Sequence, residues 1–126
     1  MASPFLQLDF TRPYAIRCFI DGGGSAISTD TAPNSAAPPA DRVARLPNYV
    51  STSQSRHAAI DGTTITLVPW IYDDSRALWV AYSAGIAATT ASGPVAGPTY
   101  TSDMAGAKIF FQVTANTLVT KAAVFL

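Results

Sequence analysis

The chain has 126 residues, a formal net charge of zero from eight basic and eight acidic side chains, and only 13% charged residues. This length fits one domain, and the zero balance excludes the strong positive field that attracts nucleic acids or anionic membranes. All the acidic residues are aspartates, and alanine occurs beside proline, glycine and threonine rather than at helical spacing. This composition predicts an all-β protein, and its sparse charge predicts a surface partly covered by partners.

The chain also lacks the usual marks of export and membrane insertion. Cys18 is the only cysteine, so an intramolecular disulfide framework is excluded. The start at Met1 has no basic stretch followed by a long apolar run, and no window approaches the roughly 18 apolar residues of a membrane span. We therefore expect a protein made in a cytoplasm, with no membrane partner.

In chain order, the N-terminal third is predicted to contain an arm, a strand and a long loop. Residues 1–13 form an extended arm or edge strand, and Tyr14–Ile20 alternates apolar and other residues as a strand does. Gly22–Ala40 is rich in glycine, proline and serine, with Ile27 as its single large apolar side chain. Such a segment is expected to be mobile in isolation and ordered where neighbouring chains cover it.

The centre of the chain predicts a β-hairpin. Asp61-Gly62 is a turn signal before the strand Ile65–Tyr72, and Asp73–Arg76 turns the chain into a returning strand, Ala77–Tyr82. Pro69 removes a ladder donor, which favours an edge position or a bulge. The residues expected in the core are Leu67, Phe111, Val124 and at least one of Trp70 and Trp79.

The C-terminal segment is predicted to form a second hairpin. Lys108–Thr114 and Leu118–Leu126 both read as strands, and Asn116-Thr117 lies between them. Pairing them across this turn would place Phe111 opposite Ala122 on one face.

No catalytic, cofactor-binding or metal-binding set is complete. Cys18 and His57 are the only thiol and imidazole, and a small buried thiol is the simpler interpretation of Cys18. One histidine and one cysteine do not supply a zinc site. Asp73 and Asp74, with Asp61 or Asp103, could ligate calcium or act as paired carboxylates, but adjacent aspartates before Ser75 fit a turn better. We therefore predict that the protein is not an enzyme.

Aromatic residues in the second half leave two interpretations open. They alternate at strand spacing, which is typical of a sandwich core with an interface patch, yet they could also form a platform on which sugars stack. The set consists of Trp70, Tyr72, Trp79 and Tyr82.

The second half also resembles a known class of protein. Asp61-Gly62 opens a strand that ends Pro69–Asp73, Leu78-Trp79 returns after a short turn, and Ala107–Thr114 precedes a final strand rich in valine, alanine and phenylalanine. This pattern is similar to small β-sandwich modules of tailed-bacteriophage virions, namely head-decoration or cement, neck and tail-accessory proteins. The resemblance implies a jelly-roll or immunoglobulin-like fold, symmetric oligomers, extended arms and no catalytic residues.

These observations predict one antiparallel β-sandwich over residues 1–126, jelly-roll-like, with an immunoglobulin-like sandwich as the alternative. The expected function is that of a virion structural protein, made in the host cytoplasm, which binds copies of itself (with a trimer as one form) and major capsid or other virion proteins. The alternative is a carbohydrate- or host-surface-binding module. The candidate interface residues are Phe5, Leu6, Leu8, Phe10, Ile27, Tyr72, Phe110 and Phe125.

Overall fold

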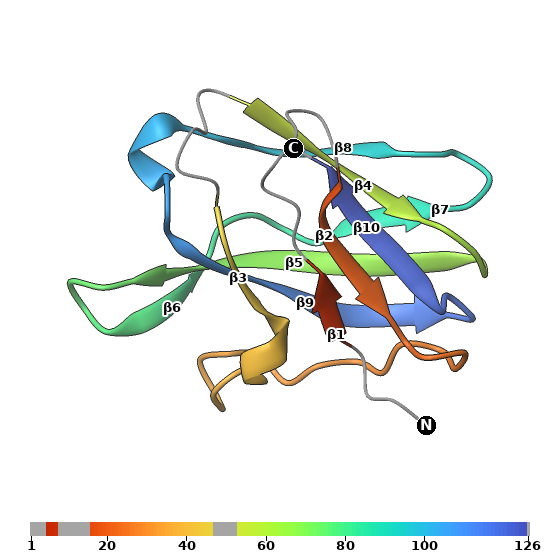
Figure 1. Ribbon diagram of the computed structural model, residues 1–126, viewed down its shortest axis with the longest axis horizontal. Coiled ribbons are helices and arrows are strands. Elements are labelled where there is room, and N and C mark those ends of the chain that lie inside the picture. The colour runs from red at the N-terminus through yellow and green to blue at the C-terminus, as the bar shows by residue number, and fades with distance from the viewer. Residues whose placement is uncertain (1–4, 8–15, 47–52, 126) are drawn as a thin grey trace.

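The computed structural model describes residues 5–7, 16–46 and 53–125 of the chain, and these residues form strands, loops and two 3-10 turns (Figure 1). No helix in these ranges is long and apolar enough to cross a membrane. The 3-10 turns are η1 (Ala40–Arg42) and η2 (Ser102–Met104). The strands are β1 (Phe5–Gln7), β2 (Ile16–Asp21), β3 (Val43–Arg45), β4 (Ser53–Ala59), β5 (Thr64–Asp73), β6 (Leu78–Ala81), β7 (Ile86–Thr89), β8 (Val95–Tyr100), β9 (Lys108–Thr117) and β10 (Lys121–Phe125).

The strands make two antiparallel sheets that pack face to face. Sheet A has the order β1-β2-β10-β4-β8, and sheet B has the order β3-β9-β5-β6, with β7 also paired to β5. From β2 onward, each connection passes to the other sheet except those joining β5, β6 and β7. This alternation, with β2 and β10 adjacent in one sheet, is jelly-roll topology. The predicted all-β, jelly-roll-like sandwich is therefore confirmed, and the immunoglobulin-like alternative does not fit the strand order.

Strand β5 shows how the sequence pattern determines the two faces of sheet B. Its burial alternates, with Ile65, Leu67 and Pro69 buried and the intervening residues half-buried. Side chains alternate across a strand, so the first set faces sheet A and the second, including Trp70, faces outward. The turn after β5 is also as predicted, because Asp73 accepts hydrogen bonds from the amides that follow it.

Pro69 lies in a central strand, so its predicted edge position is wrong. The register shift between β5 and β9 falls at Thr66/Leu67 instead, with Thr114 of β9 as the extra residue. On the side of β5 away from β9, the strand pairing has a gap at Val68 and Pro69, because β7 pairs with Thr64–Leu67 and β6 begins pairing only at Trp70. The Pro69 carbonyl faces this gap, where it accepts a hydrogen bond from the Tyr82 amide at 2.8 Å. Since a residue's N–H and C=O point to the same side, the gap is also where the missing donor would lie.

The core between the sheets is aliphatic and phenylalanine-rich rather than built on tryptophan. Leu67, Phe111 and Val124 are buried as predicted. Trp70 and Trp79 are both only half-buried, so the expectation of a core tryptophan is wrong. Both side chains lie on the outer face of sheet B, since Trp70 alternates with the buried residues of β5 and Trp79 pairs with Tyr72.

The predicted C-terminal hairpin is also wrong, because β9 and β10 belong to different sheets. β9 pairs with β5 and β3, whereas β10 pairs with β2 and β4. At the corner, the Asn116 side chain accepts a hydrogen bond from the Val119 amide and donates one to the Val119 carbonyl, and Leu118 adopts φ 64°. The corner therefore carries the chain across the sandwich instead of back along β9.

The long loop packs against its own domain. The Ile27 side chain is 2% exposed, its amide donates to the Val119 carbonyl at 3.0 Å, and the Asp30 amide donates to the Val113 carbonyl at 2.8 Å. In Figure 1 this orange segment runs along the lower edge of the sandwich from β2 toward β3. The expectation that neighbouring chains are needed to hold Gly22–Ala40 is therefore not met.

Candidate binding face on the outer side of sheet B

Outward side chains of sheet B are arranged in rows across the strands. Arg45 of β3 lies directly opposite Lys108 of β9, and Tyr72 of β5 lies opposite Trp79 of β6. The Lys108 ammonium stands 4.2 Å from the centre of the Tyr72 ring, which joins the two pairs into one row. Cross-strand neighbours on one face are close enough to interact, so this row is a continuous surface of two cations and two aromatic rings.

A second row of side chains lies next to the first on the same face of sheet B. Phe110 of β9 pairs with Trp70 of β5, and the Trp70 indole N–H donates to Gln112 Oε1 at 2.8 Å. The rings of Tyr72 and Trp79 meet edge to face at 5.2 Å, and those of Trp79 and Phe110 at 6.4 Å. Such contacts contribute about 0.5–1.5 kcal/mol each beyond simple burial. The aromatic rings are therefore held in fixed orientations.

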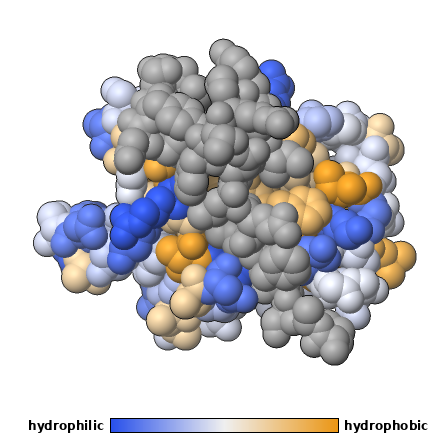
Figure 2. Space-filling model, in the orientation of Figure 1, coloured by the Kyte–Doolittle hydropathy of each residue, from blue (hydrophilic) through white to orange (hydrophobic). Residues whose placement is uncertain are grey.

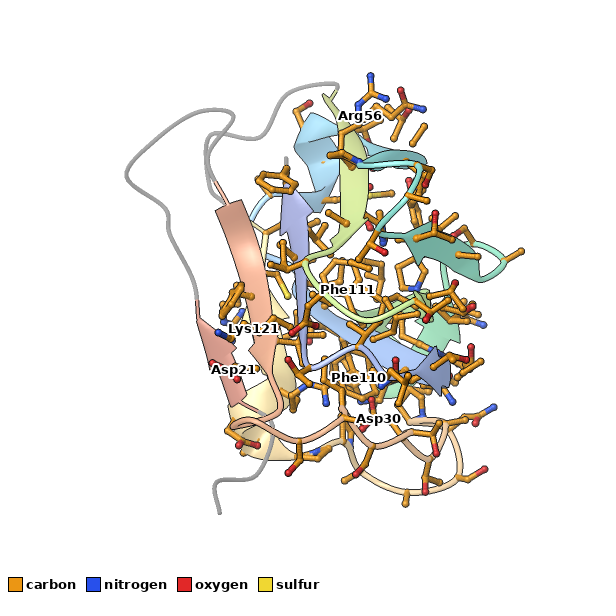
Figure 3. All side chains as sticks on the ribbon, turned by 90° about the vertical axis from the view of Figure 1, so that its right-hand side faces the viewer. Asp21, Asp30, Arg56, Phe110, Phe111 and Lys121 are labelled. Atoms are coloured by element: carbon orange, nitrogen blue, oxygen red, sulfur yellow. The ribbon has the colours of Figure 1, made fainter. Side chains whose placement is uncertain are left out.

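The long loop and η1 cover part of this face. The Arg42 guanidinium lies 5.5 Å from the centre of the Phe110 ring, and Phe110 is fully buried. Figure 3 shows Phe110 above the segment that carries Asp30, with Phe111 in the interior between the sheets. Arg42 is itself neutralised by Asp30 at 2.9 Å. The covered half of the face is thus structural, and the half around Trp79 stays open.

An open groove of about 600 Å³ lies on the uncovered half. It is lined by residues of the loop, η1, β3, β6 and β9. The lining residues are Pro38, Ala40, Val43, Ala44, Arg45, Trp79 and Lys108. Its volume falls within the range of small-ligand sites, and its lining is mostly apolar with two cationic groups.

The two cationic residues of the groove are paired in the register of β3 and β9, and neither has a carboxylate partner among the described residues. The ion pairs of the described residues join Arg42 to Asp30 and Arg76 to Asp73, and neither includes Arg45 or Lys108. Among the described residues, Arg45 donates a hydrogen bond to the Gly106 carbonyl at 3.0 Å. Like charges directly opposite on paired strands are destabilising, so this pair raises the local positive potential.

Cys18 and His57 lie on the opposite sheet, in the core. Val124 is paired with Cys18 on one side and with His57 on the other, so a strand separates the two side chains by two interstrand spacings, roughly 10 Å. Burial raises the pKa of Cys18 to about 12 and lowers the pKa of His57 to about 4. A buried thiol and a neutral imidazole at this separation do not form a nucleophilic pair.

Ser55 is the nearest polar partner of His57, but it is equally enclosed. Its Oγ lies 3.3 Å from His57 Nε2 and donates to the Pro98 carbonyl at 3.1 Å. Ser55 and His57 are both 0% exposed, and a β-carbon on Gly97 would stand 2.4 Å from Ser55 Oγ and 2.4 Å from His57 Nε2. This contact therefore packs β4 against β8, with no room for a substrate.

The aspartates considered as metal ligands or paired carboxylates act as turn residues. Hydrogen bonds from Ser75 and Arg76 lower the pKa of Asp73 to about 2. Asp61 accepts hydrogen bonds from the Thr120 hydroxyl and amide and from the Lys121 amide, which together lower its pKa. Within the described ranges, no three histidine, cysteine or acidic side chains are grouped so that they could hold a metal ion.

The predicted interface residues are scattered over the structure. Ile27 and Phe110 are buried within the chain and form no free surface, whereas Tyr72 and Phe125 are half-buried. Phe5 and Leu6 belong to edge strand β1, and the predictions for Leu8 and Phe10 fall outside the described residues. Of this set, Tyr72 alone belongs to the open aromatic row.

The cationic pair of the groove was not predicted from the sequence, because it depends on the register between two distant strands. Arg45 and Lys108 meet only through the pairing of β3 with β9, which no local pattern reveals. Among the residues whose burial is described, the exposed large apolar side chains are Ile60, Leu78, Val80 and Leu118. In the coloured part of Figure 2, hydrophobic groups lie in separate spots among hydrophilic ones.

Comparison with protein-family models, curated proteins and solved structures finds no match to this chain. The resemblance to phage virion modules therefore stays a prediction from the sequence.

Proposed function

We propose that this protein is a non-enzymatic structural protein of a bacteriophage virion, which decorates or cements the capsid or forms part of the neck or tail through subunit contacts. The observation that carries this proposal is the exposed apolar edge strand β6. Leu78 and Val80 are 40% and 38% exposed, and the strand Leu78–Ala81 contains no charged residue, proline or glycine.

The backbone of β6 is also available for pairing. Tyr82 donates to Pro69, and hydrogen-bonded pairs alternate along an antiparallel ladder. The N–H and C=O groups of Trp79 and Ala81 therefore point away from β5. Proteins normally protect such an edge with charges, proline or a bulge, so an unprotected apolar edge supports pairing with another chain. The hairpin that carries β6 projects from the left of the sandwich in Figure 1.

Three further observations agree with an assembly role. The zero net charge and 13% charged residues give little electrostatic protection against association. Jelly rolls occur in viral capsid proteins, which is an argument by analogy of fold. The phage-like sequence pattern includes β5, β6 and β9, the strands of the open aromatic face. The long loop does not add to this support, because contacts with its own domain hold it.

The test is incorporation into particles. Phage particles produced from the genome that encodes this chain should contain it in stoichiometric amounts by quantitative mass spectrometry. Val80→Lys should abolish incorporation, whereas Ile60→Lys, at a site 48% exposed and outside β6, should not. Absence of the wild-type chain from purified particles would overturn the proposal.

A second candidate, a carbohydrate- or host-surface-binding module, is favoured by one specific observation. The half-buried Trp79 forms a wall of an open groove whose volume fits a small ligand. Jelly rolls also occur in lectin domains. Soaking or titrating the protein with saccharides tests this candidate independently of particle assembly.

A further inference from the structure

We infer that the groove beside Trp79 binds an acidic saccharide, with the sugar carboxylate held between Arg45 and Lys108 and the apolar face of the ring against the Trp79 indole. This inference rests on the second candidate function and names its ligand class.

The cationic pair is the first reason. Arg45 and Lys108 are directly opposite each other, and the carboxylates seen in ion pairs within the described ranges belong to Asp30 and Asp73. Like charges on paired cross-strand neighbours repel each other, so an anion bound by both side chains relieves this repulsion as well as adding two favourable interactions.

The donor geometry leaves both cations able to bind. Arg45 uses one guanidinium nitrogen for the Gly106 carbonyl, and the rest of its fork has further N–H groups. The Lys108 ammonium makes a cation–π contact with the Tyr72 ring, 4.2 Å from its centre. This contact stabilises the positive charge without using an acceptor oxygen. Its three N–H donors remain suited to a carboxylate.

The remaining lining distinguishes a sugar from a simple anion. Trp79 is held edge to face by Tyr72 and Phe110, so its ring is presented in one orientation. Val43, Ala44 and Pro38 add an apolar wall, and about 600 Å³ is far more than a single inorganic anion needs. A pyranose ring with a carboxylate combines the apolar face and the charge that this lining complements.

Binding is measured by titration calorimetry with trigalacturonate, and matched titrations use a neutral galactose trisaccharide, hexaglutamate and sodium acetate. A Trp70→Phe variant leaves Trp79 as the sole tryptophan, so its fluorescence reports contact with the sugar directly. Trigalacturonate should bind and change this fluorescence, and its affinity should fall as salt is raised. The other three ligands should bind about tenfold more weakly or not at all.

Variants locate the site. Arg45→Glu and Lys108→Met should each raise the Kd for trigalacturonate about tenfold or more, whereas Lys121→Met, which removes the other lysine of the chain, should not. Arg45→Glu places opposite charges across β3 and β9, so its thermal midpoint should not fall, which separates lost binding from lost folding.

Three results would overturn the inference. Equal affinity for the neutral trisaccharide would indicate a neutral-sugar site and leave the carbohydrate-binding function standing. Equal affinity for hexaglutamate would indicate an acidic peptide site. Absence of binding by every saccharide would remove the second candidate function itself.

Discussion

Asp30 and Arg42 form a two-point ion pair in which the arginine is 3% and the aspartate 12% exposed. The same aspartate accepts a hydrogen bond from the Val113 amide at 2.9 Å, and the same arginine donates to the Phe111 carbonyl at 2.9 Å. The pair thus fixes the middle of the long loop, at Asp30, and the η1 turn that follows the loop, at Arg42, to β9. A segment whose composition predicts mobility is held by a few buried polar contacts.

We predict that Asp30→Ala strongly destabilises the protein. The substitution leaves the buried Arg42 charge uncompensated, which costs about 3–5 kcal/mol in the free energy of unfolding. Urea unfolding provides the measurement, and Asp41→Ala, at an exposed aspartate beside the same arginine, is the matched control. Equal losses in the two variants would show that the ion pair does not stabilise the loop.

Hydrogen exchange on the isolated protein gives a second prediction. The amides of Ile27 and Asp30 should be protected without any partner, because each donates to a backbone carbonyl of its own domain. Protection at both amides should be reduced in Asp30→Ala. Rapid exchange in the wild-type monomer would instead restore the expectation that neighbouring chains order this segment.

His57 predicts a loss of stability in mild acid. Burial lowers its folded-state pKa to about 4 from 6.5, so between these values the unfolded chain binds more protons than the folded chain. The free energy of unfolding therefore falls as pH decreases through this window, by about 3 kcal/mol in total. Urea midpoints from pH 7.5 to 4 provide the measurement.

The control for this pH dependence is His57→Gln, which should give a much flatter profile above pH 4. Asp61 and Asp73 also have lowered pKa values, but their ordinary value of 3.8 places their contribution at lower pH. A wild-type profile that is flat between pH 7 and pH 4.5 would contradict the assignment of a buried neutral imidazole.

The sequence predicted those features that depend on local alternation and turns. β5 has one buried face because Ile65, Leu67 and Pro69 recur at every second position, and Asp73 is a turn residue because its side chain binds the next amides. These signals lie within a few residues of one another. The fold class follows from several such strands with little helix-forming sequence.

Pairing partners could not be predicted in the same way. Phe111 and Val124 both face the core, and their strands would show the same alternation as hairpin partners or as strands of opposing sheets. Whether the two strands form a hairpin or enter opposing sheets depends on the corner between them, where Asn116 binds the Val119 amide and Leu118 adopts φ 64°. The groove was missed for a related reason, since Arg45 and Lys108 are brought together only by long-range register.

Two glycines with the same backbone angle should respond differently to alanine. Gly62 and Gly93 both have φ 71°, but a β-carbon on Gly62 would lie 2.3 Å from the Leu118 carbonyl oxygen, whereas nothing lies within 4 Å at Gly93. Gly93→Ala should cost about 1 kcal/mol from the left-handed conformation alone. Gly62→Ala should cost about 2–4 kcal/mol, because the Leu118 backbone must also move. Equal losses of stability in chemical denaturation would show that the Gly62 turn can move away from the Leu118 backbone at little cost in free energy.

Cys18 should be chemically inert in the folded protein. Its side chain is 2% exposed and its pKa is raised to about 12, so at pH 8 it offers almost no thiolate to a disulfide reagent. Labelling should require opening of β2 from β10, and it should therefore be at least about a thousandfold slower than labelling in urea. Labelling of the native protein at the rate of a free thiol would contradict this burial.

A Cys18→Ser variant tests whether the core of the sandwich takes part in the proposed functions. Cys18→Ser buries a hydroxyl on the inner face of sheet A, beside Val124, and should cost about 1–3 kcal/mol in stability. Because the groove lies on the outer face of sheet B, trigalacturonate binding and particle incorporation should be unchanged in folded Cys18→Ser and His57→Ala proteins. Loss of either property in a folded variant would mean that the inner face of sheet A takes part in function.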